Sequence, residues 1–374
     1  MGQPSPASDN RRAGASGRRL WFDLHSWVGL KLSLLMAFVC LTGTLAVFSH
    51  EIDWLLHPEM RVEPAERSAS WGSMLAAVRA AYPDWKVSRI EAPWGRRFAA
   101  AASVQTPDGR LRFVWIDPHR GTVTGDTGWF NTQRFLRNTH RHLMLPTRWG
   151  VPIVSSLSLA LLVTFASSFV IYKRWWRGFF SWPRGERRRR FWGDLHRLAG
   201  VWSLWFVLLI ALTGMWYLVE SLGGSAPAAQ ARWPAPTAAA TIRPALVDRS
   251  VQQARRDWPG LEIGGISLDE AGGRLVIDGQ AEAWLVRDRA NALAFDTNGR
   301  LVATVDAGGL SVHQRIAEMA DPLHFGTFGG LLTQALWFVF GAAMTLLSLS
   351  GVYLFGLRSA ESLRPRRPRH GAPA

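Results

Sequence analysis

The chain has 374 residues, of which 48% are hydrophobic and 19% are charged, and its formal net charge is +15. The hydrophobic residues gather in four stretches, each near the roughly 20 residues that a helix needs to cross a bilayer: 28–48, 151–172, 201–219 and 331–355. This distribution excludes a soluble globule, a disordered chain and a secreted disulfide scaffold. Since Cys40 is the one cysteine, an intramolecular disulfide and a cysteine-based metal site are also excluded.

The positive charge is concentrated in three short segments beside these stretches. Lys and Arg outnumber Asp and Glu by 4 to 1 in residues 1–20, by 8 to 1 in 173–190 and by 5 to 1 from residue 358 onward. The positive-inside rule places such segments in the cytoplasm. We therefore expect both termini to be cytoplasmic, the long connections to lie on the other side, and the partner of the basic residues to be the lipid bilayer, with no nucleic acid.

The first hydrophobic stretch is not followed by a small-residue cleavage pattern, so we expect an uncleaved span. The sequence is also an internal duplication. The segment W-F-D-L-H at 21–25 recurs as W-G-D-L-H at 192–196, and L-T-G at 41–43 recurs as L-T-G at 212–214. Each half therefore has the order span, external segment, span.

We expect a membrane protein, mainly α, with four transmembrane helices in two repeated halves and two external α+β domains. The expected segments are a cytoplasmic tail (1–18), transmembrane helix 1 (19–49), the first external domain (50–149), transmembrane helix 2 (150–173), a basic cytoplasmic loop (174–191), transmembrane helix 3 (192–220), the second external domain with its Pro/Ala linker (221–323), transmembrane helix 4 (324–357) and a cytoplasmic tail (358–374).

Periodicity and turn residues predict the elements of the external domains. They are a helix at 71–81, strands at 110–116, 274–277, 284–286 and 293–295, and turns at 117–121 and 296–299.

Histidines occupy matching places at the span ends. His25 lies near the cytoplasmic end of the first span, and His196 has the equivalent place on the third. Ionisable groups at the edge of a span are costly and tend to be functional. Two such helices that face each other would supply both axial ligands of one haem, and two imidazoles leave the iron no open position, which suits electron transfer.

A second set of histidines lies at the external side. His142 precedes Ser168 by 26 residues and His324 precedes Ser350 by 26, so this register pairs His142 with His324. His140 is an alternative, since residues 140–142 read His-Arg-His, and His50 at the external end of the first span is another. We expect two haem groups, one for each pair.

Nearby residues have both functional and structural interpretations. Asp23 and Asp194 are repeat-matched candidates for orienting an imidazole or a nearby residue, and Lys31, Arg141 and Arg197 are candidates for pairing with haem propionates. Four glycines near the histidine face of the odd-numbered spans leave room for a macrocycle or simply allow close helix packing: Gly29, Gly43, Gly200 and Gly214. A lone histidine at the interface would otherwise be an amphipathic anchor.

Three motifs resemble those of PepSY-associated transmembrane proteins. They are the repeated L-H-x-x-x-G…L-T-G spans, F-x-x-E-I-D at 48–53 and D-P-x-x-G at 117–121. The resemblance covers roughly residues 18–358 and is weaker in the second external segment, where D-T-N-G at 296–299 lacks the proline and one residue of spacing.

This family includes bacterial iron-regulated inner-membrane proteins and ferric-siderophore reductases. The resemblance implies four spans in the inner membrane, periplasmic PepSY-like domains, haem b between the spans and reduction of ferric siderophore in the periplasm. The family's histidines correspond to His25, His142, His196 and His324.

The leading functional hypothesis is therefore an oxidoreductase that transfers electrons from an unknown cytoplasmic donor to ferric siderophore and releases Fe(II) for uptake. The alternative is a non-enzymatic PepSY membrane protein that binds a periplasmic partner or protease. A permease is disfavoured because the first and third spans offer few polar residues near the bilayer midplane.

Overall fold

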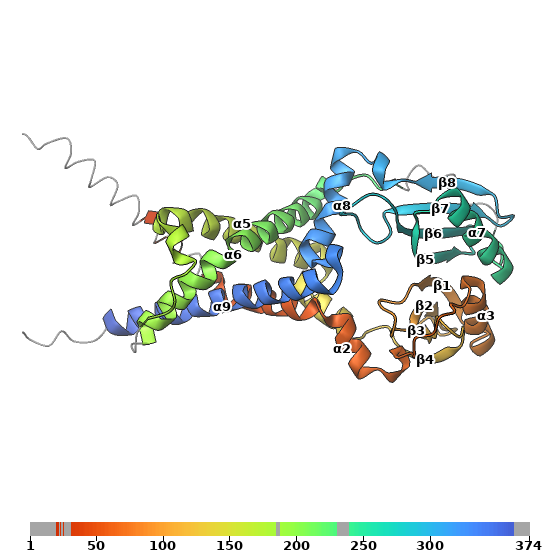
Figure 1. Ribbon diagram of the computed structural model, residues 1–374, viewed down its shortest axis with the longest axis horizontal. Coiled ribbons are helices and arrows are strands. Elements are labelled where there is room, and N and C mark those ends of the chain that lie inside the picture. The colour runs from red at the N-terminus through yellow and green to blue at the C-terminus, as the bar shows by residue number, and fades with distance from the viewer. Residues whose placement is uncertain are drawn as a thin grey trace, which may run out of the picture. The chain divides into compact units, whose positions relative to one another are not determined.

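The computed structural model describes residues 20, 21, 23, 25, 31–184, 188–229 and 239–362 (Figure 1). The chain divides into two compact units. The helical unit comprises the described residues of Met1–Leu45, Thr139–Ser221 and Ala335–Ala374, and the sheet unit comprises those of Ala46–Asn138 and Leu222–Gln334.

Apolar helices of membrane-spanning length make up most of the helical unit. Among the described residues, α5 (Thr147–Ile171), α6 (Arg188–Val219) and α9 (Gly330–Ser362) are long and apolar enough to cross a bilayer. The bent pair formed by the helix Lys31–Ala46 and α2 (Ser49–Leu56) supplies a fourth if it is counted as one span. These helices support a multi-pass membrane protein.

Close contacts hold the spans together. The helix Lys31–Ala46 packs on α5 through a buried cluster of Met36, Val39, Leu157 and Ala160. On α9, a Cβ built at Gly341 would lie 2.5 Å from the Thr44 hydroxyl oxygen, so only glycine permits this approach. Small residues at such crossings are the usual device for packing helices in a bilayer.

The sheet unit contains one antiparallel sheet of eight strands in the order β4-β3-β2-β1-β5-β6-β7-β8. The strands are β1 (Lys86–Glu91), β2 (Ala100–Gln105), β3 (Leu111–Ile116), β4 (Val123–Gly128), β5 (Glu262–Asp269), β6 (Arg274–Gln280), β7 (Asn291–Asp296) and β8 (Leu301–Val305). Each half is a helix followed by a four-stranded meander. Helix α3 (Trp71–Ala81) precedes β1–β4, and α7 (Pro244–Asp257) precedes β5–β8.

The two meanders join where β1 pairs with β5, with Ile90 opposite Ile266. Helices α3 and α7 lie side by side against the same sheet (Figure 1) and share one core with it. The backbone N–H of Gly72 donates to Asp248 Oδ1 at 2.7 Å, and a Cβ at Gly72 would lie 2.3 Å from the carbonyl oxygen of Pro244. The sequence predicted two α+β segments but not that they would form one sheet.

Two of the sequence motifs that carry the resemblance form a helix cap and a turn. The last residue of F-x-x-E-I-D, Asp53, is buried and accepts hydrogen bonds from the backbone N–H groups of Thr132 and Gln133, both at 2.9 Å. It therefore caps the start of α4 (Thr132–His142). In D-P-x-x-G, burial alone would raise the pKa of Asp117, but hydrogen bonds from Arg120 and from backbone N–H groups lower it below its ordinary value.

Most of the predicted external elements are present. The helix at 71–81 is α3, and the strand at 110–116 is β3 with one residue fewer. The strands at 274–277 and 293–295 lie within β6 and β7, and the segments 117–121 and 296–299 are turns.

The strand predicted at 284–286 is wrong. These residues lie in the loop between β6 and β7, where Leu285 has φ 55°, a left-handed conformation that no strand contains. Val286 is buried against Ala290 and Ala307 in a small separate cluster. An apolar run that packs inside a loop cannot be distinguished by pattern from a short strand.

The centre of the sheet contains a buried ion pair. Arg89 on β1 reaches across β5 and donates from Nη2 to Asp278 Oδ1 on β6 at 2.8 Å and from Nη1 to Ser267 Oγ at 2.7 Å. A Cβ at Gly265 would lie 2.5 Å from the guanidinium, so the missing side chain leaves its path open. Burial alone would lower the pKa of Arg89, yet the bonds and charge of Asp278 and Glu91 raise it.

We predict that Asp278→Ala destabilises the protein by about 3 kcal/mol, because it leaves a buried guanidinium without its main partner. The side chain of Asp278 is only 6% exposed. Urea unfolding of the full chain in detergent, followed by tryptophan fluorescence, measures the change. The control is Asp108→Ala, which removes an exposed ion pair with Arg110 and should leave the midpoint unchanged. Equal shifts in both variants would contradict the prediction.

Candidate functional site

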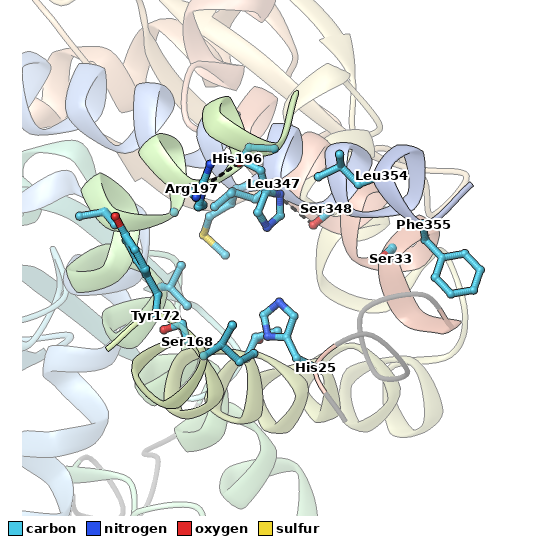
Figure 2. Close-up of a pocket in the computed structure, with 18 of the residues that line it drawn as sticks. His25, Ser33, Ser168, Tyr172, His196, Arg197, Leu347, Ser348, Leu354 and Phe355 are labelled. Atoms are coloured by element: carbon cyan, nitrogen blue, oxygen red, sulfur yellow. Dashed lines mark hydrogen bonds between the residues drawn. The ribbon is translucent and has the colours of Figure 1, made fainter. Parts of the chain in front are cut away.

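The helical unit contains a cavity of about 1460 Å³, larger than the roughly 300–1,000 Å³ usual for small-molecule pockets. Its walls come from the first span and from α5, α6 and α9. His25 and His196 both line it, and Figure 2 shows their rings on opposite sides of the open space, pointing toward each other. The two histidines that the sequence paired by position are therefore brought to one cavity.

A serine of α5 holds the first of these rings. His25 Nδ1 lies 2.8 Å from Ser167 Oγ, and the hydroxyl of Ser167 also donates to the carbonyl oxygen of Thr164 at 3.0 Å. Since a hydroxyl has one hydrogen to donate, its oxygen accepts from the imidazole N–H. This bond network assigns the proton of neutral His25 to Nδ1 and leaves the lone pair on Nε2.

The second half repeats this arrangement. His196 Nδ1 lies 2.8 Å from Ser350 Oγ on α9, and Ser350 donates to the carbonyl oxygen of Leu347 at 3.2 Å. The same reasoning places the proton on Nδ1 and the lone pair on Nε2. One cavity thus receives two imidazoles with matching tautomers. A metal-binding histidine usually has this form, with the other ring nitrogen donating to an oxygen.

Of the two roles expected for Asp194, the structure shows contact with a nearby residue. Asp194 forms an ion pair with Arg197 and accepts from the backbone N–H of Arg184 at 3.1 Å. It therefore holds Arg197 rather than the imidazole. For Asp23 the structure gives an exposed position.

The sequence analysis named no hydrogen-bond partner for His25. Ser168 served there only to align the second and fourth spans, and its hydroxyl donates to the carbonyl oxygen of Phe165 at 2.6 Å, whereas its neighbour Ser167 meets His25. The sequence gives no signal for which of two adjacent serines faces a ring, because neighbours on a helix point about 100° apart.

The glycines of the spans have different surroundings. Gly200 lines the cavity, and the nearest atom to a Cβ built there is 3.7 Å away on Leu347. At Gly214 a Cβ would lie 3.2 Å from Ser158, which is a helix-packing contact. Gly29 lies outside the described residues.

Gly43 is covered by the ring of His140. A Cβ built at Gly43 would lie 2.6 Å from His140 Cε1. His140 Nδ1 lies 2.8 Å from the carbonyl oxygen of Val39 and therefore donates to it, which again leaves the lone pair on Nε2. Burial lowers the pKa of His140 below its ordinary value, so the ring is neutral at pH 7.

His142 ends α4, and the chain then turns through Leu143 and Met144, both with positive φ, before α5 begins at Thr147. Helices α4 and α5 are therefore separate. His142 Nδ1 is buried and has no hydrogen-bond partner among the described residues. A buried ring nitrogen without a partner is costly, which makes His142 a candidate ligand.

The remaining two candidates belong to the sheet unit. His50 stacks on Trp94 with ring centroids 4.2 Å apart, and His324 lies in the last turn of α8 (Val312–Phe325), edge-on to Phe325. Their pairing with His140 or His142 stays a prediction. No group of three or more His, Cys, Asp or Glu residues able to hold a metal ion occurs in the described part of the chain. Two imidazoles suffice for haem iron.

Comparison with known proteins confirms the family resemblance. The model of the family described as PepSY-associated TM region matches residues 12–358. An uncharacterized protein of Pseudomonas aeruginosa is 27% identical over 258 residues, which are 61% of this chain and 64% of the relative. The match thus spans less than two thirds of that relative's length.

We predict that Gly43→Ala destabilises the helical unit, because its Cβ would displace the buried His140 ring. Overpacking of this kind typically costs about 1–3 kcal/mol. The repeat-matched Gly214→Ala meets a contact of 3.2 Å and is the control. Thermal unfolding in detergent should show a lower midpoint for Gly43→Ala and little change for Gly214→Ala. Equal midpoints would mean that the His140 ring moves aside freely.

Proposed function

The chain belongs to the PepSY-associated TM region family, and from its paired histidines we propose that it is a haem-containing oxidoreductase of the bacterial inner membrane. It transfers electrons across the membrane and reduces ferric siderophore in the periplasm, which releases Fe(II) for uptake. The observation that carries the proposal is the pair His25 and His196, whose rings enter one cavity, each with Nδ1 2.8 Å from a serine hydroxyl oxygen.

The residues of the cavity fit haem b. His25 and His196 each present an Nε2 lone pair, and Ser167 and Ser350 fix the orientation of the rings through Nδ1. The body of the cavity is lined by apolar side chains, among them Leu32, Met36, Phe165, Val207, Leu347 and Leu354. Haem held by two imidazoles supplies one-electron transfer without an open coordination position.

We further propose a second haem b nearer the external side. His142 and His324 are its leading ligands, with His140 and His50 as alternates. The unpartnered Nδ1 of His142 and the neutral, carbonyl-bonded ring of His140 both support a ligand role at this end of the helical unit.

The charge distribution supports the direction of electron transfer. The basic segments 1–20, 173–190 and 358–374 favour cytoplasmic termini and a cytoplasmic short loop, and hence a periplasmic sheet unit. The electron donor is then cytoplasmic and the ferric siderophore periplasmic. One electron converts Fe(III) to Fe(II), which the hard oxygen donors of a siderophore hold less tightly.

Absorption spectroscopy of the purified full chain tests the proposal. We expect sharp low-spin b-type bands on reduction with dithionite and close to two haems per chain by pyridine haemochrome. His25→Ala or His196→Ala should remove one haem while the protein still inserts into the membrane. A colourless wild-type protein from haem-replete cells would refute the proposal and favour a non-enzymatic protein that binds a periplasmic partner.

A second prediction concerns the serine that orients His196. Ser350→Ala should weaken haem binding by about 10–100-fold, since loss of a hydrogen-bond partner at Nδ1 loosens a metal-binding histidine. Ser168→Ala is the matched control, because Ser168 lines the same cavity but bonds a backbone carbonyl. Haem titration of protein from haem-depleted cells measures both. Equal affinities for the two variants would show that Ser350 does not act through His196.

A further inference from the structure

The cavity has a strongly basic end that the histidines do not explain. Among the described residues that line it there are five arginines and no Asp or Glu. The arginines are Arg188, Arg189, Arg190, Arg197 and Arg358. The positive-inside rule explains why a cytoplasmic loop is rich in arginine. It does not explain why five of these side chains line a cavity between the helices.

These arginines come from two helix ends. Four lie in the first three turns of α6, and Arg358 lies near the end of α9. Figure 1 shows the beginning of α6 and the end of α9 at the same end of the helical unit. In the close-up, Arg197 lies on the wall of the cavity (Figure 2). The cavity therefore has a basic end and an apolar body.

Such a concentration of positive charge favours an anion. The five arginines are exposed side chains at the rim of the cavity. Charge-assisted hydrogen bonds to a carboxylate or phosphate are the strong bonds that a guanidinium forms. The N-terminal end of α6 adds the positive end of its helix dipole. Arg197 also forms an ion pair with Asp194.

We propose that this arginine end is an anion-binding subsite for the acidic head of an amphiphile whose apolar body fills the rest of the cavity. Two molecules share that chemistry: haem b, through its two propionates, and an anionic phospholipid, through its phosphate. The haem source rests on the proposed function, whereas the lipid source does not. For haem, the subsite turns the propionate edge toward the basic end.

Affinity for haem b and for its dimethyl ester tests the haem source. The full chain is purified from haem-depleted cells and titrated with each compound. The wild type should bind haem b at least about tenfold more tightly than the ester, since one charge-assisted contact is worth about a factor of ten. Arg188→Gln combined with Arg190→Gln should remove this preference. Arg148→Gln, on α5 outside the cavity, should retain it.

Phosphatidylglycerol retained per chain after purification tests the lipid source in the same variants. If the wild type binds haem b and its ester with equal affinity, and only the double variant loses retained lipid, the subsite binds lipid. If the wild type binds both haem compounds equally and the double variant retains as much lipid as the wild type, the subsite proposal is refuted. If neither haem compound binds, the proposed function fails, and lipid retention alone decides between the subsite and its absence.

Discussion

The helical unit depends on satisfying both nitrogens of two imidazoles that sit among apolar helices. An imidazole has one donor and one acceptor, and burying either without a partner costs free energy. The hydroxyl oxygens of Ser167 and Ser350 accept hydrogen bonds from the ring N–H groups, and each hydroxyl donates a hydrogen bond to a backbone carbonyl of its own helix. The Nε2 of each ring is then the acceptor that faces the cavity. The register of α5 against the first span brings Ser167 to His25, and that of α9 against α6 brings Ser350 to His196. These registers therefore determine which ring nitrogens face the cavity.

The sheet unit also has two similar halves, and their pairing removes two exposed strand edges. Each meander alone would have an open edge strand at β1 or β5, and such edges pair readily with other chains. Pairing β1 with β5 closes both edges internally. The join is made specific by Arg89, which crosses β5 to Asp278 over the space left by Gly265. A polar contact of this kind selects one register, because a slip by one residue would turn Arg89 toward the apolar core.

The sequence predicted those features whose cause is local. The helix at 71–81 and the strand at 110–116 follow from periodicity, and the matched positions of His25 and His196 follow from repetition. Features that depend on rotation or on distant pairing were not accessible. The choice of Ser167 over Ser168 depends on how α5 is turned, and the β1–β5 join leaves no pattern in either strand. The loop at 284–286 was mistaken for a strand because burial alone produced its apolar run.

Positions at which the two halves carry different residues are also informative. The odd-numbered spans are offset by 171 residues, since His196 matches His25, and by that offset Arg197 matches Ser26. Spans two and four are offset by 182, since His324 matches His142, so Arg358 matches Trp176. Two equivalent histidines hold a planar ligand equally well in either of two orientations. By the offset of 171, Arg189 and Arg190 match Arg18 and Arg19, whereas Arg197 and Arg358 have no basic counterpart. On the proposed function, the two histidines would provide both ligands of one planar group, and Arg197 and Arg358 would make its two orientations unequal through charge-assisted bonds to an acidic edge.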